Sequence, residues 1–251
     1  MNNKKVDEAK LQVLKVIDKN DNLAISFNRV FNLPMRLLII GSSGSGKSNM
    51  LVNLLLNENY GYKDIWEGDD IYLFAPSPMN DNKLKLIIEQ KEIPDSNVFD
   101  NFSNELLDSV YEMLVEDYEE AIAQKEKITH KLIILDDLSF SSKFADRFNI
   151  LAKVYQNGRK FLVSVICLAQ YYNQMTPAIR NNSTGIIAFR MPNSKLEVLE
   201  SEHNYLLGGK KAFVGMFKTH VKEARDFICI NYSNNSDELY LDKNFNNITP
   251  I

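Results

Sequence analysis

The stretch that decides the fold is Gly41-Ser42-Ser43-Gly44-Ser45-Gly46-Lys47-Ser48. An apolar run at residues 35–40 precedes it, and residues 49–56 follow it with the composition of a helix. The stretch matches the pattern G-x-x-x-x-G-K-[ST], and the order of strand, glycine-rich loop and helix is the context that this pattern requires. The sequence therefore predicts a loop that binds phosphate groups.

Each residue type in this loop has a chemical reason. Glycines at 41, 44 and 46 let the backbone bend so that successive N–H groups point at an anion, and the following helix adds its positive N-terminal end. Lys47 is placed to reach the β- and γ-phosphates of ATP, and the Ser48 hydroxyl is placed to hold Mg²⁺. The predicted ATP-binding residues are Gly41, Ser42, Ser43, Gly44, Ser45, Gly46, Lys47, Ser48 and Asn49.

Composition and charge are those of an ordinary globular protein. The chain has 251 residues, 45% of them hydrophobic and 25% charged, a length that allows one large domain or two small ones. The net charge of −4 is not that of a protein that coats nucleic acid, so any such contact requires a local basic patch. No apolar run approaches the roughly 18 residues of a membrane span. We divide the chain into an N-terminal helix and arm, residues 1–32, and one domain, residues 33–251.

Apolar runs alternate with segments of helical periodicity along the chain. The expected strands are residues 35–40, 70–75, 131–137, 161–169 and 185–190, and the expected helices are residues 46–56, 82–91, 103–126, 143–157 and 194–207, the last capped by Asn193 or Ser194. This alternation predicts an α/β fold with a mainly parallel central sheet and helices on both faces. Residues 226–232 and 238–241 predict a short antiparallel hairpin at the C-terminal edge.

The N-terminal segment has two parts. Residues 4–19 have the periodicity of an amphipathic helix, and residues 23–31 are a short strand or a docking arm. The arm either packs against the core or reaches a neighbouring subunit, and we favour packing against the core.

Two carboxylates follow the apolar run at residues 131–135. A second strand that ends in an acidic residue is expected next to a phosphate-binding loop, and Asp136 is placed to hold Mg²⁺. Asp137 is placed to orient the attacking water or to accept its proton. An acidic pair favours hydrolysis over transfer of the phosphoryl group to a second substrate.

Gln170 follows the apolar run at residues 161–169. Ligands of α/β sheets bind outside the carboxyl ends of the strands. If this strand lies beside the strand that ends at Asp136, Gln170 faces the γ-phosphate, where its amide can donate to phosphate and accept from water.

Two arginines are candidates for stabilising the charge that develops during phosphoryl transfer, a task that a neighbouring subunit often performs. They are Arg159, just before the strand that ends at Gln170, and Arg180, in the segment 176–182, with Arg147 as a third candidate. Each can also be an ordinary surface or ion-paired arginine.

With these residues in place, the chain resembles the genome-packaging ATPases of large DNA viruses and virophages, the poxvirus-type branch of the FtsK–HerA superfamily. The resemblance covers three blocks in order within roughly residues 35–190: residues 39–48, residues 132–138, and residues 158–171 followed by Pro-Ala-Ile-Arg-Asn-Asn at 177–182. A histidine is common in that branch where Lys160 stands here.

This resemblance implies a RecA-like P-loop NTPase core and a homo-oligomeric ring, with six subunits favoured over five. It also implies ATP-driven movement of double-stranded DNA into a capsid, with capsid proteins as further partners. The implied location is inside the cell, in the host cytoplasm where virions assemble, or in the virion itself.

The residues alone leave two other functions open. A small-molecule kinase can use the same loop, although the Asp136–Asp137 pair and Gln170 argue against it. A regulatory switch can hydrolyse ATP without moving DNA. The candidate DNA-facing lysines are Lys195, Lys210, Lys211, Lys218 and Lys222, and residues 208–211 are expected to form a flexible basic loop or a merely solubilising turn.

Overall fold

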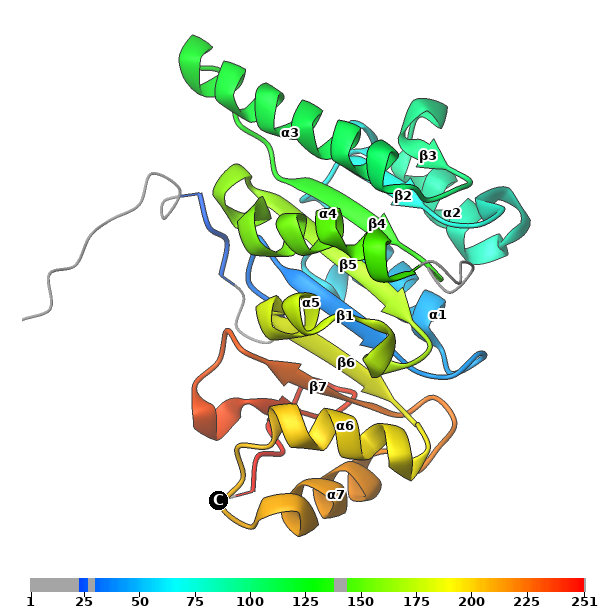
Figure 1. Cartoon of the computed structure of the whole chain (residues 1–251), viewed down its shortest axis with the longest axis vertical. Coiled ribbons are helices and arrows are strands. Elements are labelled where there is room, and N and C mark those ends of the chain that lie inside the picture. The colour runs from blue at the N-terminus through cyan, green and yellow to red at the C-terminus, as the bar shows by residue number, and fades with distance from the viewer. Residues whose placement is uncertain (1–22, 27–29, 138–143, 251) are drawn as a thin grey trace, which may run out of the picture.

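The computed structural model describes residues 23–26, 30–137 and 144–250. Within them the chain forms one sheet of eight strands in the order β3-β2-β4-β5-β1-β6-β7-β8 (Figure 1). The strands are β1 (Arg36–Ile40), β2 (Ile71–Phe74), β3 (Val98–Phe99), β4 (Lys131–Leu135), β5 (Val163–Ala169), β6 (Gly185–Phe189), β7 (Phe227–Asn231) and β8 (Tyr240–Leu241). In this order, every pair of neighbouring strands from β3 to β6 is parallel. The pairs β6–β7 and β7–β8 are antiparallel. The mainly parallel sheet with an antiparallel C-terminal edge is confirmed.

Helices cover both faces of this sheet (Figure 1). They are α1 (Lys47–Leu56), α2 (Asn82–Lys91), α3 (Asn104–Gln124), α4 (Phe144–Asn157), α5 (Pro177–Asn182), α6 (Asn193–His203) and α7 (Gly209–His220). One apolar core joins the sheet to residues of α3 to α7, and a second joins the opposite face to α1 and α2.

Strand β1 shows why the sequence forms a central strand. Leu38 and Ile40 belong to the first core, whereas Leu37 and Ile39 belong to the second, and all four are fully buried. Because successive side chains point to opposite faces, a strand that is covered twice needs a continuous apolar run. The run at residues 35–40 meets this requirement and places the following loop at the carboxyl edge of the sheet.

The structure corrects two expectations and adds two elements that were not expected. Residues 208–211 are not a flexible loop, because α7 begins at Gly209 and buries Phe213, Met216 and Phe217. Neither Asn193 nor Ser194 caps α6, since Pro192 occupies the capping position and fixes the backbone there. The sequence also did not predict α5 or the two-residue strand β3, which are too short for a periodic signal.

The described part of the N-terminal arm packs on the domain. Val30 and Phe31 are buried, and residue Ile25 pairs with Leu33 in an isolated antiparallel bridge. The favoured packing against the core therefore holds for these residues. The helix expected at residues 4–19 lies outside the described residues, and the division at 32/33 stays a prediction. Among the described helices, none is both long and apolar enough to cross a membrane.

Candidate functional site

The glycine-rich loop leaves the carboxyl end of β1 and runs into the first turn of α1. Gly44 and Gly46 have φ angles of 74° and 114°, in the region that side chains with a Cβ rarely adopt. Gly46 is the capping residue of α1, so the helix starts at Lys47 with its N–H groups directed at the loop. The predicted order of strand, loop and helix is confirmed.

Gly41 and Ser45 show that the loop is closely packed around a polar space. A Cβ on Gly41 would lie 2.6 Å from Ser45 Oγ and 2.7 Å from the Phe189 Cβ. The Ser45 hydroxyl is buried and finds no hydrogen-bond partner among the described residues. A buried hydroxyl without a partner is costly unless a ligand satisfies it. This observation does not depend on the sequence motif, and it indicates that the loop can accommodate a phosphate group.

Lys47 lies over the loop. Its Nζ donates to the carbonyl oxygens of Gly41 at 2.7 Å and Ser42 at 3.2 Å. Burial lowers the pKa of Lys47, while the charges of Asp136 and Asp137 act in the opposite direction. The two carboxylates that the sequence predicted for the metal and for the water thus lie close enough to the lysine to act on its protonation.

Asp136 is the most perturbed acid of the site. Its N–H still donates to the Phe74 carbonyl on β2, and its side chain is buried. Burial first, then the charges of Asp137 and Asp81, raise the pKa of Asp136 to about 6. A buried carboxylate beside other carboxylates favours a bound cation, because the cation restores the charged form. Asp136 therefore fits the expected Mg²⁺ site, and the role of Ser48 as its partner ligand stays a prediction.

Asp81 is a charged neighbour of Asp136 that sequence reasoning missed. It caps α2, and its Oδ1 accepts from the N–H groups of Lys83 at 2.7 Å and Leu84 at 3.3 Å. The sequence signal was an acid at the start of the helix expected at residues 82–91, which indicates a cap but not a neighbour of Asp136.

Asp137 has a φ of 46°, a left-handed conformation that is unusual for a residue with a side chain. Such strained positions concentrate at functional sites. Asp137 lies two residues after Leu135, the last residue of β4, and is the residue to which the sequence assigned the attacking water.

The position of Gln170 depends on the strand order, which the sequence left conditional. Strand β5 lies between β1 and β4, with Ala169 opposite Ile40 and Cys167 opposite Leu135. Gln170 therefore follows the strand that separates the glycine-rich loop from Asp136. The condition on which its predicted role rested is met.

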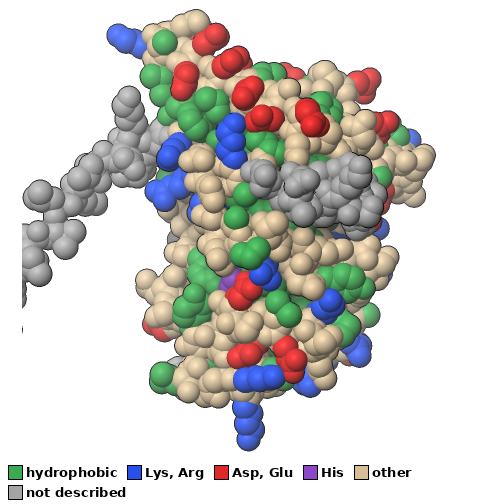
Figure 2. Space-filling model, in the orientation of Figure 1, with side chains coloured by type: hydrophobic (Ala, Val, Ile, Leu, Met, Phe, Trp, Pro, Cys, Tyr) green, Lys and Arg blue, Asp and Glu red, His purple; other side chains and the backbone are tan. Residues whose placement is uncertain are grey.

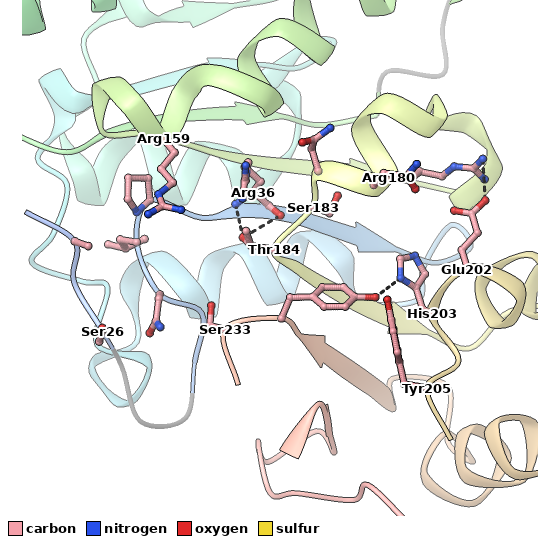
Figure 3. A pocket seen from close by; sticks show the side chains of 17 residues that line it. Ser26, Arg36, Arg159, Arg180, Ser183, Thr184, Glu202, His203, Tyr205 and Ser233 are labelled. Carbon is pink, nitrogen blue, oxygen red and sulfur yellow. Dashed lines mark hydrogen bonds and ion pairs between the residues drawn. The ribbon is translucent and has the colours of Figure 1, made fainter. Parts of the chain in front are cut away.

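The two predicted arginines lie elsewhere, in a cavity of about 770 Å³ that we call the arginine pocket. Arg36, Arg159 and Arg180 all line it (Figure 3). Arg36 begins β1 and Arg159 precedes β5, so both lie at the amino edge of the sheet, opposite the loop. A strand of seven residues spans roughly 20 Å. Neither arginine can thus reach the loop of its own subunit.

Arg180 is held by a polar network on one side of this pocket. Its Nη2 pairs with Glu202 Oε1 at 2.9 Å (Figure 3). Its guanidinium lies 5.0 Å from the centre of the Tyr172 ring. The Tyr172 hydroxyl donates to Glu202 at 2.9 Å and also bonds His203, whose other ring nitrogen bonds Tyr232. Tyr172 stands two residues after Gln170, so this network joins the end of β5 to Arg180.

Arg36 is a second residue that sequence reasoning missed. Its Nη1 donates to the Tyr155 carbonyl at 3.2 Å, and its buried Nε has no acceptor within the described part of the chain. Burial, and then the nearby charge of Arg159, lower the pKa of Arg36. Like charges held together in a partly buried pocket favour an anionic ligand. The signal in the sequence was a charged residue inside the apolar run at residues 35–40.

The structure places the five candidate lysines in different surroundings, and Lys211 is simply exposed. Lys210 pairs with Glu197 at 2.8 Å, and Lys195 lies 4.9 Å from the centre of the Tyr171 ring. Lys218 and Lys222 line a cavity beside the glycine-rich loop. Figure 2 shows acidic side chains spread over α3, and Met113 on the same helix is 38% exposed.

The fold and the glycine-rich loop define the class of protein, which is an α/β protein with the fold of P-loop ATPases. Residues 23–243 match the family described as Poxvirus A32 protein. The chain belongs to this family, and the poxvirus-type resemblance of the sequence is confirmed.

Solved structures with the same fold come from a virus and from bacteria. The genome packaging NTPase B204 of Sulfolobus turreted icosahedral virus 2, in complex with AMP, has a TM-score of 0.52 at 12% identity, over 80% of this chain and 94% of that chain. The cytoplasmic domain of the Thermomonospora curvata type VII secretion ATPase EccC has a TM-score of 0.55 at 15% identity, over 81% of this chain and 25% of that chain. ATPases 2 and 3 of EssC from Geobacillus thermodenitrificans have a TM-score of 0.51 at 18% identity, over 68% of this chain and 35% of that chain.

A relative by sequence is protein 015R of Frog virus 3 (isolate Goorha), which is 23% identical over 158 residues. The match covers 63% of this chain and 44% of that protein. The chain therefore spans less than half the length of this relative, and about a third of the EssC chain.

Proposed function

We propose that this protein is an Mg²⁺-dependent ATPase that moves double-stranded DNA and packages a viral genome into a capsid. The observation that supports it most is the strand order β4-β5-β1, because it brings the ends of three adjacent strands, at Asp136, Gln170 and Gly41, to one edge of the sheet. Family membership and the fold shared with the packaging NTPase B204 support the choice of a viral packaging motor. The proposed sites of action are the host cytoplasm and the assembling virion.

In the proposed reaction, the loop amides and Lys47 bind the triphosphate, and Lys47 exchanges its loop carbonyls for phosphate oxygens. Mg²⁺ held by Ser48 and Asp136 would neutralise charge on the β- and γ-phosphates. Asp137 orients the attacking water and accepts its proton, and Gln170 donates to the γ-phosphate. Water is the acceptor, so the products are ADP and phosphate.

The arginine pocket supports a ring. Arg159 lies too far from the loop of its own subunit, so it would act on the nucleotide of the next subunit. We assign the same role to Arg180, because it lines the same pocket. A head-to-tail ring provides such an interface, with six subunits favoured and five as the alternative. Capsid proteins are further partners in this proposal.

The test is phosphate release from ATP with Mg²⁺, measured with and without linear duplex DNA at low and moderate salt. Lys47→Ala is the blank and should abolish hydrolysis. A rise in rate with duplex that fades as salt increases is expected, because counterions compete with phosphate contacts. Hydrolysis that ignores DNA under all conditions would instead favour the regulatory switch, and phosphate transfer only to an added acceptor would favour the kinase.

A mixing experiment tests the action of the arginines between subunits. Arg159→Ala and Arg180→Ala are each mixed with Lys47→Ala, and hydrolysis is measured before and after mixing. If an arginine acts on the neighbouring nucleotide, mixing restores part of the activity, because some interfaces then pair an intact loop with an intact arginine. An arginine variant that is inactive alone and stays inactive in the mixture does not act across the interface.

A further inference from the structure

A groove of about 490 Å³ lies between α3 and α4, on the opposite face of the sheet from α1 and α2. Residues of α3 form one wall, and residues from the end of α4 and the turn after it, among them Lys153 and Lys160, form the other. Val115 and Phe161 supply apolar surface. We call it the α3–α4 groove. The proposed reaction at the glycine-rich loop uses none of its residues.

Tyr111 indicates that the groove lacks an occupant among the described residues. This side chain lines the groove and is only 2% exposed, and its hydroxyl has no hydrogen-bond partner in the described part of the chain. Burial raises the pKa of Tyr111 to about 12, so the hydroxyl is a neutral donor at neutral pH. Because a buried donor without an acceptor is costly, a group from outside the described residues is expected to bond it.

The charge that the groove leaves unpaired is negative. Three exposed glutamates of α3 line it and form no ion pair within the described ranges: Glu112, Glu116 and Glu119. The lysines of the opposite wall have partners of their own. Lys153 pairs with Asp108 at 3.1 Å, and Lys160 donates to the Asn157 side chain at 3.2 Å. The groove therefore complements an occupant that combines apolar side chains with positive charge.

The described residues begin beside this groove. The Leu23 carbonyl oxygen lies 2.9 Å from Nε2 of His130, which belongs to the connection between α3 and β4. Figure 1 shows residues 23–26 on the same side of the molecule as the last residues of α3 and α4. The residues that precede Leu23 in the chain therefore start close to the end of α3.

The sequence of residues 4–19, which lie outside the described residues, has the composition that the groove calls for. Lysines at positions 4, 5, 10, 15 and 19 exceed the acids at 7, 8 and 18, and apolar residues stand at 6, 11, 14 and 17 with helical spacing. A helix of this length would span about 24 Å, and α3 extends for about 18 Å from Glu112 to its end. Residues 20–22 bridge up to about 13 Å, which allows the segment to turn back along α3.

We propose that residues 4–19 dock in the α3–α4 groove of their own chain, with their apolar side chains against Val115 and Phe161 and their lysines beside the three glutamates of α3. This proposal does not depend on the proposed ATPase activity, because no residue of the groove belongs to the nucleotide site.

The test is carbodiimide cross-linking of the full chain, which joins a lysine amine to a carboxylate only where the two groups touch, followed by peptide mass spectrometry. We expect links from residues 4–19 to Glu112, Glu116 or Glu119. Asp117 and Glu120 are internal controls, because they are exposed on α3 but do not line the groove. Links that are absent from the groove glutamates, or equally frequent at the control acids, would overturn the proposal.

The same reaction on a mixture of isotope-labelled and unlabelled protein identifies the chain that supplies the segment. Links within one chain are expected. Links that join labelled to unlabelled peptides would overturn the proposal and assign the groove to a second copy of the protein.

A charge reversal tests the electrostatic part. Glu112→Lys combined with Glu116→Lys should release the segment, whereas Asp117→Lys combined with Glu120→Lys makes the same change of charge outside the groove. Chymotrypsin cleavage after Leu11 and Leu14 should become about tenfold faster in the groove variant, because proteolysis follows the population of the released segment, and should stay unchanged in the control. Equal cleavage rates in both variants and the wild type would overturn the proposal. The cross-linking needs no variant, so it decides the question even if the groove variant fails to fold.

Discussion

Acidification below pH 6.5 should destabilise the protein through His203. Burial first, and then the charge of Arg180, lower the pKa of His203 from 6.5 to about 4. The folded protein therefore binds fewer protons at this ring than the unfolded chain does between these values, so stability falls as the pH falls through this window. At one pKa unit per 1.36 kcal/mol, the loss is about 2 kcal/mol at pH 5 and about 3 kcal/mol at pH 4.

The physical cause is the network around the ring. Tyr172 and Tyr232 bond its two nitrogens, and Arg180, paired with Glu202, lies on the same side of the pocket. A proton on the ring would add a cation to a site that already holds arginines. It would also break any hydrogen bond in which a tyrosine hydroxyl donates to a ring nitrogen, because that nitrogen would then carry a proton.

The assay is urea unfolding of the wild type and of His203→Gln at pH 7.5 and pH 5.0. The wild type should lose about 2 kcal/mol more than the variant between the two pH values, because the variant lacks the titrating ring. His220→Gln, at the partly exposed end of α7, controls for the loss of a histidine. Curves for the wild type and His203→Gln that fall in parallel would refute the reasoning, because they would mean that the buried ring accepts a proton at no cost.

Three further predictions concern the water, the arginine and the arm. Asp137→Asn should keep ATP binding and lower turnover by about 100-fold or more, the usual contribution of a general base; loss of binding in a calorimetric titration would make this residue a metal ligand or a structural one. Glu202→Gln removes the ion pair of Arg180, so kcat should fall by up to about 100-fold while the Kd of ATP stays constant; a raised Kd with constant kcat would contradict a positioning role. Gly185→Ala places a Cβ 2.4 Å from the Phe31 ring, so urea unfolding should show a free energy of unfolding that is lower by about 1 to 3 kcal/mol. Adding Phe31→Leu should partly restore it, whereas an unchanged unfolding midpoint in Gly185→Ala would show that this ring does not pack there.

The parts of the site that the sequence predicted are those whose chemistry is contiguous in the chain. The glycine-rich loop needs a strand before it and a helix after it, and all three are readable within about twenty residues. Asp136 follows a short apolar run, which forms the buried strand β4. In each case local composition and global fold demand the same structure.

Positions that depend on contacts between distant segments were not readable. Arg36, Arg159 and Arg180 share one pocket because β1 lies between β5 and β6, and no local pattern carries that order. Helix α7 was missed for a different reason. Its first residues, Gly-Lys-Lys, have the composition of a turn, although the stripe Phe213, Met216 and Phe217 has helical spacing and buries its side chains.

In the proposed motor, the two edges of the sheet have different roles. The carboxyl edge carries the loop and Asp136, whereas the amino edge carries the arginine pocket. One subunit therefore presents unlike surfaces at its two edges, which is the requirement for a head-to-tail contact and not for a two-fold one. Tyr172 joins these surfaces within the subunit, because it follows Gln170 by two residues and bonds the Glu202 that holds Arg180. If Gln170 contacts the γ-phosphate and Arg180 acts on the next subunit, as proposed, Tyr172 and Glu202 connect these two events within one subunit.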